Sequence, residues 1–121
     1  MTAGQGRRAL GTYGETLAAR YLSEAGMTVL DRNWRCDLGE LDLVLRDTGA
    51  LVVCEVKTRT SDAFGHPLEA VTTVKLARLR RLAALWLAQA AWAPHGVRID
   101  LVGVRLDRSG DQRIEHVRGV G

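Results

Sequence analysis

Four ionisable residues lie in a stretch that otherwise has the composition of buried strands. This stretch, GELDLVLRDTGALVVCEVKTRT at residues 39–60, contains Glu40, Asp42, Glu55 and Lys57 among leucines and valines. Charged groups are costly to bury in a small sheet unless they pair, bind a metal or take part in catalysis. The stretch is therefore the first candidate for a functional site.

The first half of this stretch is predicted to be a strand that carries Glu40 and Asp42 on one face. Successive strand residues point to opposite faces, and leucines alternate with the two carboxylates at positions 41, 43 and 45. We therefore expect the three leucines to share the other face. The tetrapeptide RDTG at 46–49 then favours a turn, which predicts an antiparallel hairpin with the next strand.

The second strand, ALVVCEVKT, is apolar on both faces except at Glu55 and Lys57, which is typical of a central strand. These two side chains share a face about 7 Å apart, and the hairpin would bring Asp42 alongside Glu55. Two carboxylates suit a hard divalent cation such as Mg²⁺ or Mn²⁺, which is commonly held by one or two carboxylates and substrate phosphates. The lysine would orient the attacking water or stabilise charge that develops in the transition state.

The same residues also have a structural explanation. Glu55 and Lys57 would form an ion pair at a sheet edge, and Asp42 would simply face solvent. The apolar neighbours of Glu55 favour the metal site, because a charge without a partner is expensive in a buried strand. Glu40, directly after Gly39, is explained equally well as a ligand at the rim of the site and as a solvated residue.

Charged residues outside this stretch need separate consideration. Thr12 and Glu15 match a helix capping box, so Glu15 by itself is explained as a cap. Asp100 is expected to share a strand face with Arg98 and to pair with it. Lys75 is predicted at the start of a helix, where a solvated helix face and contact with substrate phosphate are equally good explanations.

Hydrophobic periodicity predicts an α/β fold, with a mixed sheet flanked by helices. The predicted elements are, in chain order, a helix from Thr12 to Ala25, strands at 27–35, 39–46 and 50–58, a helix from Thr73 to Ala91, and strands at 97–106 and 112–117. The second helix has a basic first half. A chain of 121 residues, 46% of them hydrophobic, fits one domain. We expect it at 11–118, between a flexible basic tail at 1–10 and a short tail at 119–121.

Composition narrows the functional classes. The net charge of +3 is compatible with nucleic-acid binding but does not require it. Cys36 and Cys54 lack the spacing of a zinc site, and we expect them to be reduced residues in or near the core. The N-terminus lacks the apolar segment of a signal peptide, and the most apolar run, at 82–93, is too short to cross a bilayer. We expect a cytoplasmic protein without a membrane partner.

Five motifs, in this order, together resemble a known family. They are GTYGETLAARYL (11–22), NWRCDLGELDLV (33–44), VVCEVKTR (52–59), FGHPLEAV (64–71) followed by Lys75, and VRIDLV (97–102). The chain closely resembles the bacterial YraN-type family, which is placed in the restriction-endonuclease-like PD-(D/E)xK superfamily and is similar to archaeal Holliday junction resolvases. The resemblance covers about Gly11 to Val104. No literal Pro-Asp is present, because Asp42 follows Leu41.

The resemblance implies an αβββαβ core and a role for each matching residue. Asp42 matches the motif aspartate, and Glu55 and Lys57 match the (D/E)xK pair. Val56 would offer its backbone carbonyl to the metal, and Glu15 would be an outer carboxylate of the metal site as well as a cap. Lys75 matches a later basic position near the substrate. His66, in FGHPLEAV, is given no role.

Three hypotheses follow. The first is a Mg²⁺- or Mn²⁺-dependent endonuclease that cuts DNA. In its more specific form, the substrate is branched or junction DNA and the protein is a homodimer, as the resemblance to resolvases implies. The second is a catalytically inactive nucleic-acid-binding module on the same fold, which holds phosphates through basic residues such as Lys75, Arg78 and Arg81. The third is a protein that binds another protein, whose basic charge is incidental.

Overall fold

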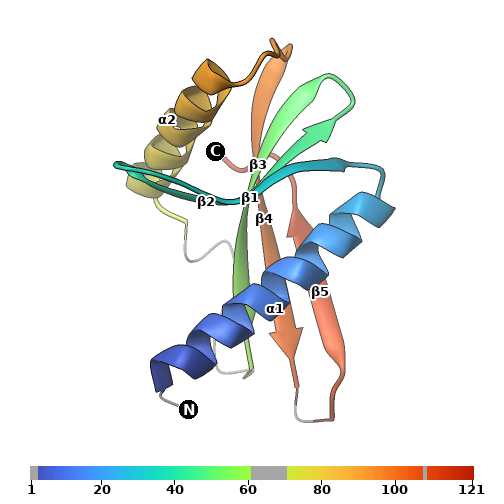
Figure 1. Cartoon of the computed structure of the whole chain (residues 1–121). Helices are drawn as coiled ribbons and strands as arrows, with labels where there is room; N and C mark the ends of the chain where they lie inside the picture. Colours follow the sequence, from blue (N-terminus) through green and yellow to red (C-terminus); the bar gives the residue numbers. More distant parts are fainter. Residues whose placement is uncertain (1–2, 61–70, 108) are drawn as a thin grey trace.

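Five strands and two helices make up the computed structural model, which describes residues 3–60, 71–107 and 109–121 (Figure 1). The elements are α1 (Ala3–Glu24), β1 (Thr28–Cys36), β2 (Gly39–Asp47), β3 (Ala50–Arg59), α2 (Thr73–Gln89), β4 (Gly96–Leu106) and β5 (Gln112–Val117). The strands form one sheet in the order β1-β2-β3-β4-β5. This confirms the predicted α/β class and is consistent with an αβββαβ core, to which β5 adds a fifth strand.

The sheet is mixed because of the connection between β3 and β4. Strands β1, β2 and β3 pair antiparallel through short turns, and β4 pairs antiparallel with β5. Strand β4 instead runs parallel to β3, with continuous pairing from Ala50↔Gly96 to Arg59↔Arg105. A parallel neighbour needs a crossover connection, and α2 belongs to that crossover.

The two helices pack on opposite faces of the sheet. On one face, buried residues of α1 meet those of the sheet: Leu17, Ala18, Leu22, Met27, Leu43, Leu45, Val52, Cys54, Val102 and Val104. On the other face, buried residues of α2 do the same: Leu41, Val44, Leu51, Val53, Leu79, Leu82, Ala83, Trp86, Ile99, Leu101 and Val120. Cys54 is a buried free thiol and Cys36 is half-buried, as predicted.

Helix α2 covers only part of its face. Its buried residues pack on the first half of β3 and β4, up to Val53 and Leu101. Figure 1 shows the lower ends of β3, β4 and β5 running well past α2. The second half of these strands therefore presents side chains beyond the helix, and Glu55 lies at the boundary.

Both chain ends differ from the prediction. Helix α1 begins at Ala3 rather than Thr12, so residues 3–10 belong to the helix instead of a tail. The alanine, glutamine, arginine and leucine in this segment are good helix formers. Thr12 is an interior residue that accepts a hydrogen bond on its carbonyl from Thr16 Oγ1 (3.0 Å), so the predicted capping box was wrong.

The C-terminal residues 119–121 were also predicted as a tail, and they are packed against the domain instead. The Val120 N–H donates to the Ile99 carbonyl (2.8 Å), and the Val120 side chain is buried. Arg80 donates to the Gly121 carbonyl (2.7 Å). An apolar side chain near the end of the chain thus completes the core beneath α2.

Asp100 is the fully buried charged residue that holds this end of the sheet together. Its carboxylate accepts from Arg98 Nε and Nη2 (2.8 and 3.0 Å) and from the Gly119 N–H (3.0 Å), and lies 2.7 Å from His116 Nε2. Arg98 also donates to Asp47 (2.9 Å). Burial favours a higher pKa for Asp100, but the hydrogen bonds from Arg98, Gly119 and His116 together lower it. The predicted Arg98–Asp100 pair is confirmed.

No helix in the described part of the chain has the length and apolar character needed to cross a membrane.

Replacing the buried Asp100 with alanine should destabilise the fold strongly, because the half-buried Arg98 guanidinium would lose its main partner and the Gly119 N–H would lose its acceptor. We expect a loss of about 3–5 kcal/mol in the free energy of unfolding, measured by urea denaturation. Asp37→Ala, at an exposed position in the β1–β2 turn, is the control and should change stability by less than about 0.5 kcal/mol. Similar losses in the two variants would contradict a structural role for Asp100.

Candidate active site

Asp42 lies where β2 separates from β3. Backbone pairing between the two strands ends at Leu43↔Cys54, although β3 continues to Arg59. Beyond that pair, the Asp42 carboxylate takes the place of a backbone acceptor: the Val56 N–H donates to Asp42 Oδ2 (2.9 Å). This hydrogen bond fixes Asp42 against β3, between the positions of Glu55 and Lys57.

At the same point, the regular alternation of β2 side chains between the two sides of the sheet is interrupted. Leu43 and Leu45 pack against α1, whereas Leu41 packs against α2 with Val44. The prediction that Leu41, Leu43 and Leu45 share a face was therefore wrong. A regular strand keeps alternate residues on one side, and this one does not across Asp42, where its pairing with β3 has ended.

Glu55 is the centre of the charged cluster on β3. Its Oε1 lies 2.7 Å from Lys75 Nζ and 3.7 Å from Lys57 Nζ. Lys57 thus lies beside Glu55, as the strand spacing predicted. Lys75 is in the first turn of α2, where its backbone N–H donates to the N-cap Thr72 (3.1 Å). The cap therefore also directs a lysine into the site.

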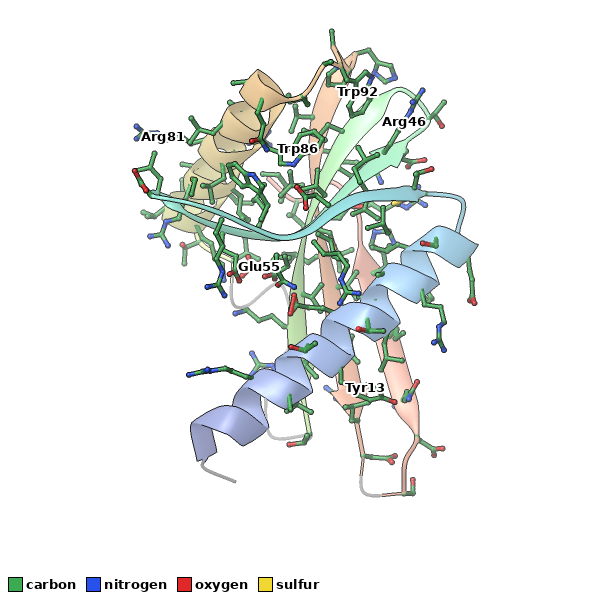
Figure 2. All side chains as sticks on the ribbon, viewed as in Figure 1. Tyr13, Arg46, Glu55, Arg81, Trp86 and Trp92 are labelled. Atoms are coloured by element: carbon green, nitrogen blue, oxygen red, sulfur yellow. The ribbon has the colours of Figure 1, made fainter. Side chains whose placement is uncertain are left out.

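A cavity of about 280 Å³ opens at this place between β2, β3 and α2. Figure 2 shows Glu55 at the lower end of α2, on the side where the β1–β2 hairpin passes. The residues that line the cavity are Gly39, Glu40, Asp42, Glu55, Lys75, Arg78, Leu79 and Leu82. It therefore has acidic residues from the sheet, basic residues from the helix, and an apolar base.

Glu15 approaches the cluster from α1 because of a glycine that we did not single out from the sequence. A Cβ at Gly14 would overlap the Thr58 side chain on β3, so only glycine allows this close approach of helix and strand. The sequence does contain a signal for this contact. A glycine inside a predicted helix costs about 1 kcal/mol and usually marks a place where the helix packs closely against another element.

The carboxylates of the cluster interact through their charges. Burial, followed by the charges of Glu55 and Glu40, raises the pKa of Asp42 from its ordinary value of 3.8 to about 6, although the Val56 N–H and Lys57 oppose the shift. Burial, followed by the charge of Asp42, also raises the pKa of Glu15. Negative charge from α1, β2 and β3 thus converges on one region.

Two carboxylate oxygens in this region, Glu15 Oε2 and Glu55 Oε2, are buried and have no hydrogen-bond partner among the residues that the structure describes. Such atoms are rare in folded proteins and call for an explanation. Within the described ranges, no three His, Cys, Asp or Glu side chains lie close enough to form a metal site alone. Mg²⁺ commonly takes one or two carboxylates together with water and phosphate, so Asp42 and Glu55 fit that smaller set.

The remaining predicted residues divide into two groups. Arg78 lines the cavity, whereas Figure 2 shows Arg81 pointing away from it on the outer side of α2. Glu40 Oε2 accepts from Arg35 Nε (2.6 Å), and both side chains are partly exposed, so Glu40 is a surface ion-pair partner that also lines the cavity. His66 and most of the FGHPLEAV motif lie outside the described residues.

The comparison with protein families gives a match to the uncharacterised protein family UPF0102 over residues 14–104. This range contains Glu15, Asp42, Glu55, Lys57 and Lys75. The chain belongs to the UPF0102 family. At this level the resemblance to the YraN-type family is confirmed.

Relatives of similar length carry the same family name. The UPF0102 protein of a Nocardioides species is 58% identical over 115 residues, which cover 95% of this chain and 93% of the relative. That of Streptomyces griseus is 61% identical over 115 residues, or 94% of this chain and 97% of the relative. That of Beutenbergia cavernae is 60% identical over 113 residues, or 93% and 96%.

Without metal, the protein should lose stability as the pH rises from about 4 to about 6. In that range folded Asp42, with a pKa of about 6, keeps a proton that the unfolded chain has released at its ordinary value of 3.8. The folded state then binds more protons, so the free energy of unfolding falls with rising pH. Asp42→Asn removes this titration and should flatten the dependence.

Urea denaturation in a chelating buffer at several pH values between about 4 and 7 measures this difference. Equal pH dependence in wild type and Asp42→Asn would contradict the raised pKa.

Proposed function

We propose that this protein is a metal-dependent DNA endonuclease that hydrolyses phosphodiester bonds, with Asp42, Glu55, Lys57 and Glu15 as its catalytic site. The observation that carries the proposal is the pair of buried, unpartnered oxygens on Glu15 and Glu55, close to an aspartate whose pKa is raised. A divalent cation held by Asp42 and Glu55 would satisfy the Glu55 oxygen and offset the negative charge of the cluster, including that of Glu15.

In this proposal Asp42 and Glu55 hold Mg²⁺ or Mn²⁺, together with the Val56 backbone carbonyl. Val56 also has a second role, because its N–H donates a hydrogen bond that keeps the Asp42 carboxylate in position. Glu15 approaches from α1 as the outer carboxylate. When bound, such a cation polarises a phosphoryl oxygen and makes hydroxide available near neutral pH.

The two lysines have different parts. Lys57 is half-exposed and 3.7 Å from Glu55, so its ammonium can turn toward an incoming phosphate, orient the attacking water and stabilise the charge that develops on the phosphoryl oxygens. Lys75 is closer to Glu55 and less exposed, and it neutralises that carboxylate until substrate and metal arrive. Arg78, which lines the cavity, adds positive charge on α2 for phosphate contacts, whereas Arg81 would contact phosphates only on the outer side of the helix.

DNA is the proposed substrate because basic residues accompany the acidic cluster. Resemblance to the PD-(D/E)xK endonucleases and to Holliday junction resolvases supports a more specific form of the proposal, in which branched DNA is cut by a homodimer.

A specific contact favours a second candidate, a nucleic-acid-binding module without catalysis. Lys75 Nζ lies 2.7 Å from Glu55 Oε1, so a protein cation already accompanies the carboxylate that would hold the metal. On this account the site is a salt-bridged cluster. The two candidates differ in whether added metal binds at Asp42 and Glu55.

Metal binding should therefore stabilise the protein. At a hundredfold excess over its Kd, Mn²⁺ should raise the free energy of unfolding at neutral pH by about 2.7 kcal/mol, measured by denaturation with and without the ion. The gain should be smaller at pH about 5, where Asp42 is protonated. Glu55→Gln should abolish it, whereas Glu24→Gln at the exposed end of α1 should keep it. Stabilisation that persists in Glu55→Gln would place the ion elsewhere.

Cleavage is the direct test of the activity. Purified protein with Mg²⁺ or Mn²⁺ should cut linear, flapped or four-way DNA, as followed on denaturing gels. Asp42→Ala and Lys57→Ala should each lower the rate about 100-fold or more while DNA binding persists. Retained DNA binding without cleavage of any of these substrates would overturn the nuclease assignment and favour the binding module.

A further inference from the structure

A second and larger cavity, about 430 Å³ in volume, lies along the ends of β3, β4 and β5 that run past α2. Among the described residues, those that line it are Lys57, Arg59, Gly103, Val104, Arg105, Arg113, Ile114 and Glu115. Four of these eight are basic and one is acidic. We call this hollow the strand-end groove.

The sheet register places most of these residues on one face. Glu55 is paired with Leu101, which packs against α2, so residues two and four positions further along both strands share the α2 face. Lys57 pairs with Gly103, and Gly103 pairs with Glu115. The strand-end groove thus continues the face of the sheet that carries Glu55, past the end of α2.

Three arginines form the next row across this face. Arg59 pairs with Arg105 on β4, and Arg105 pairs with Arg113 on β5. Neighbouring strands are about 4.8 Å apart, so the row extends about 10 Å across the sheet. Gly103, in the row before it, has no side chain, which leaves room between Lys57 and Glu115.

Lys57 connects the groove to the proposed active site. It lines the groove and also lies 3.7 Å from Glu55 in the neighbouring cavity. From Lys57 to Arg59 the positive charge advances about 7 Å along β3. The guanidinium fork matches the geometry of phosphate oxygens, and a concave surface with cations in a row is the kind that follows a nucleic-acid backbone.

We propose that the strand-end groove binds the phosphodiester backbone of a DNA strand that leads away from the bond held beside Lys57. The inference rests on the proposed function, which supplies both the substrate, DNA, and the position of the cleaved bond from which the strand leads away. It assigns Arg105 and Arg113, neither of which belongs to the metal site, as phosphate-binding residues. Binding of an acidic protein segment is the competing use of the same charges.

The test measures binding of a fluorescein-labelled oligo-dT of about 15 nucleotides by anisotropy, in chelating buffer and at a series of salt concentrations. Each phosphate contact with a single strand contributes about 0.7 to the slope of log K against log salt. Arg105→Gln/Arg113→Gln should therefore make the slope shallower by about 1.4 and weaken binding. Arg105→Lys/Arg113→Lys should retain most of the slope.

A matched control removes the same charge elsewhere. Arg20→Gln/Arg46→Gln changes an exposed arginine on α1 and one at the opposite end of the sheet, where Arg46 lies over the Trp92 ring (5.4 Å). Figure 2 shows Arg46 and Trp92 at the end of the sheet away from Tyr13. This variant should keep the slope of the wild type.

The inference is overturned if the control lowers the slope as much as the groove variant does, because net charge alone would then explain binding. An unchanged slope in Arg105→Gln/Arg113→Gln would overturn it too, as would an equal loss in the lysine variant or displacement of oligo-dT by an oligoglutamate peptide of equal charge. These measurements are made in chelating buffer, without a divalent cation. A failure of the groove is therefore distinguishable from a failure of the proposed nuclease, which metal binding and cleavage decide.

Discussion

The hydrogen bond from the Val56 N–H to Asp42 is the contact on which the rest of the site depends. Strand β2 stops pairing with β3 just before it, so a side-chain carboxylate accepts the bond where a backbone carbonyl would otherwise do so. A backbone N–H needs an acceptor when it is buried. This requirement holds half-buried Asp42 against the central strand β3, between Glu55 and Lys57, where charges act more strongly on one another than they do in bulk water.

The consequence is a cluster whose charges are only partly balanced. Lys75 and Lys57 both lie near Glu55 Oε1. Within the described part of the chain, however, the Oε2 atoms of Glu15 and Glu55 have no partner, and the pKa of Asp42 is raised to about 6. The contrast with Asp100 is informative. That aspartate has no exposed surface, but both of its carboxylate oxygens have hydrogen-bond partners and its pKa is lowered. The fold can therefore neutralise a buried carboxylate, and it does so at Asp100 but not fully around Asp42.

Sequence periodicity predicted the order of elements and the proximity of Asp42, Glu55 and Lys57, because alternation in the strands and the helical stripes depend on local composition. Glu15 was assigned to the site only through the family resemblance. The pairing of Arg98 with Asp100 followed from the same reasoning. Other features depend on tertiary contacts and could not be predicted in this way. The change of faces at Leu41 occurs where pairing with β3 ends, the start of α1 at Ala3 overrides a capping pattern at Thr12, and Lys75 reaches Glu55 only because α2 packs across the sheet.

The same geometry makes the central claim measurable at atomic resolution. Crystals grown with Mn²⁺ near neutral pH would show the ion by its anomalous scattering. The proposal predicts a peak between the carboxylates of Asp42 and Glu55, in contact with Glu55 Oε2 or with the oxygens of Asp42, at metal–oxygen distances slightly above 2 Å. Well-ordered carboxylates with no peak between them, and Lys75 still paired with Glu55, would contradict it.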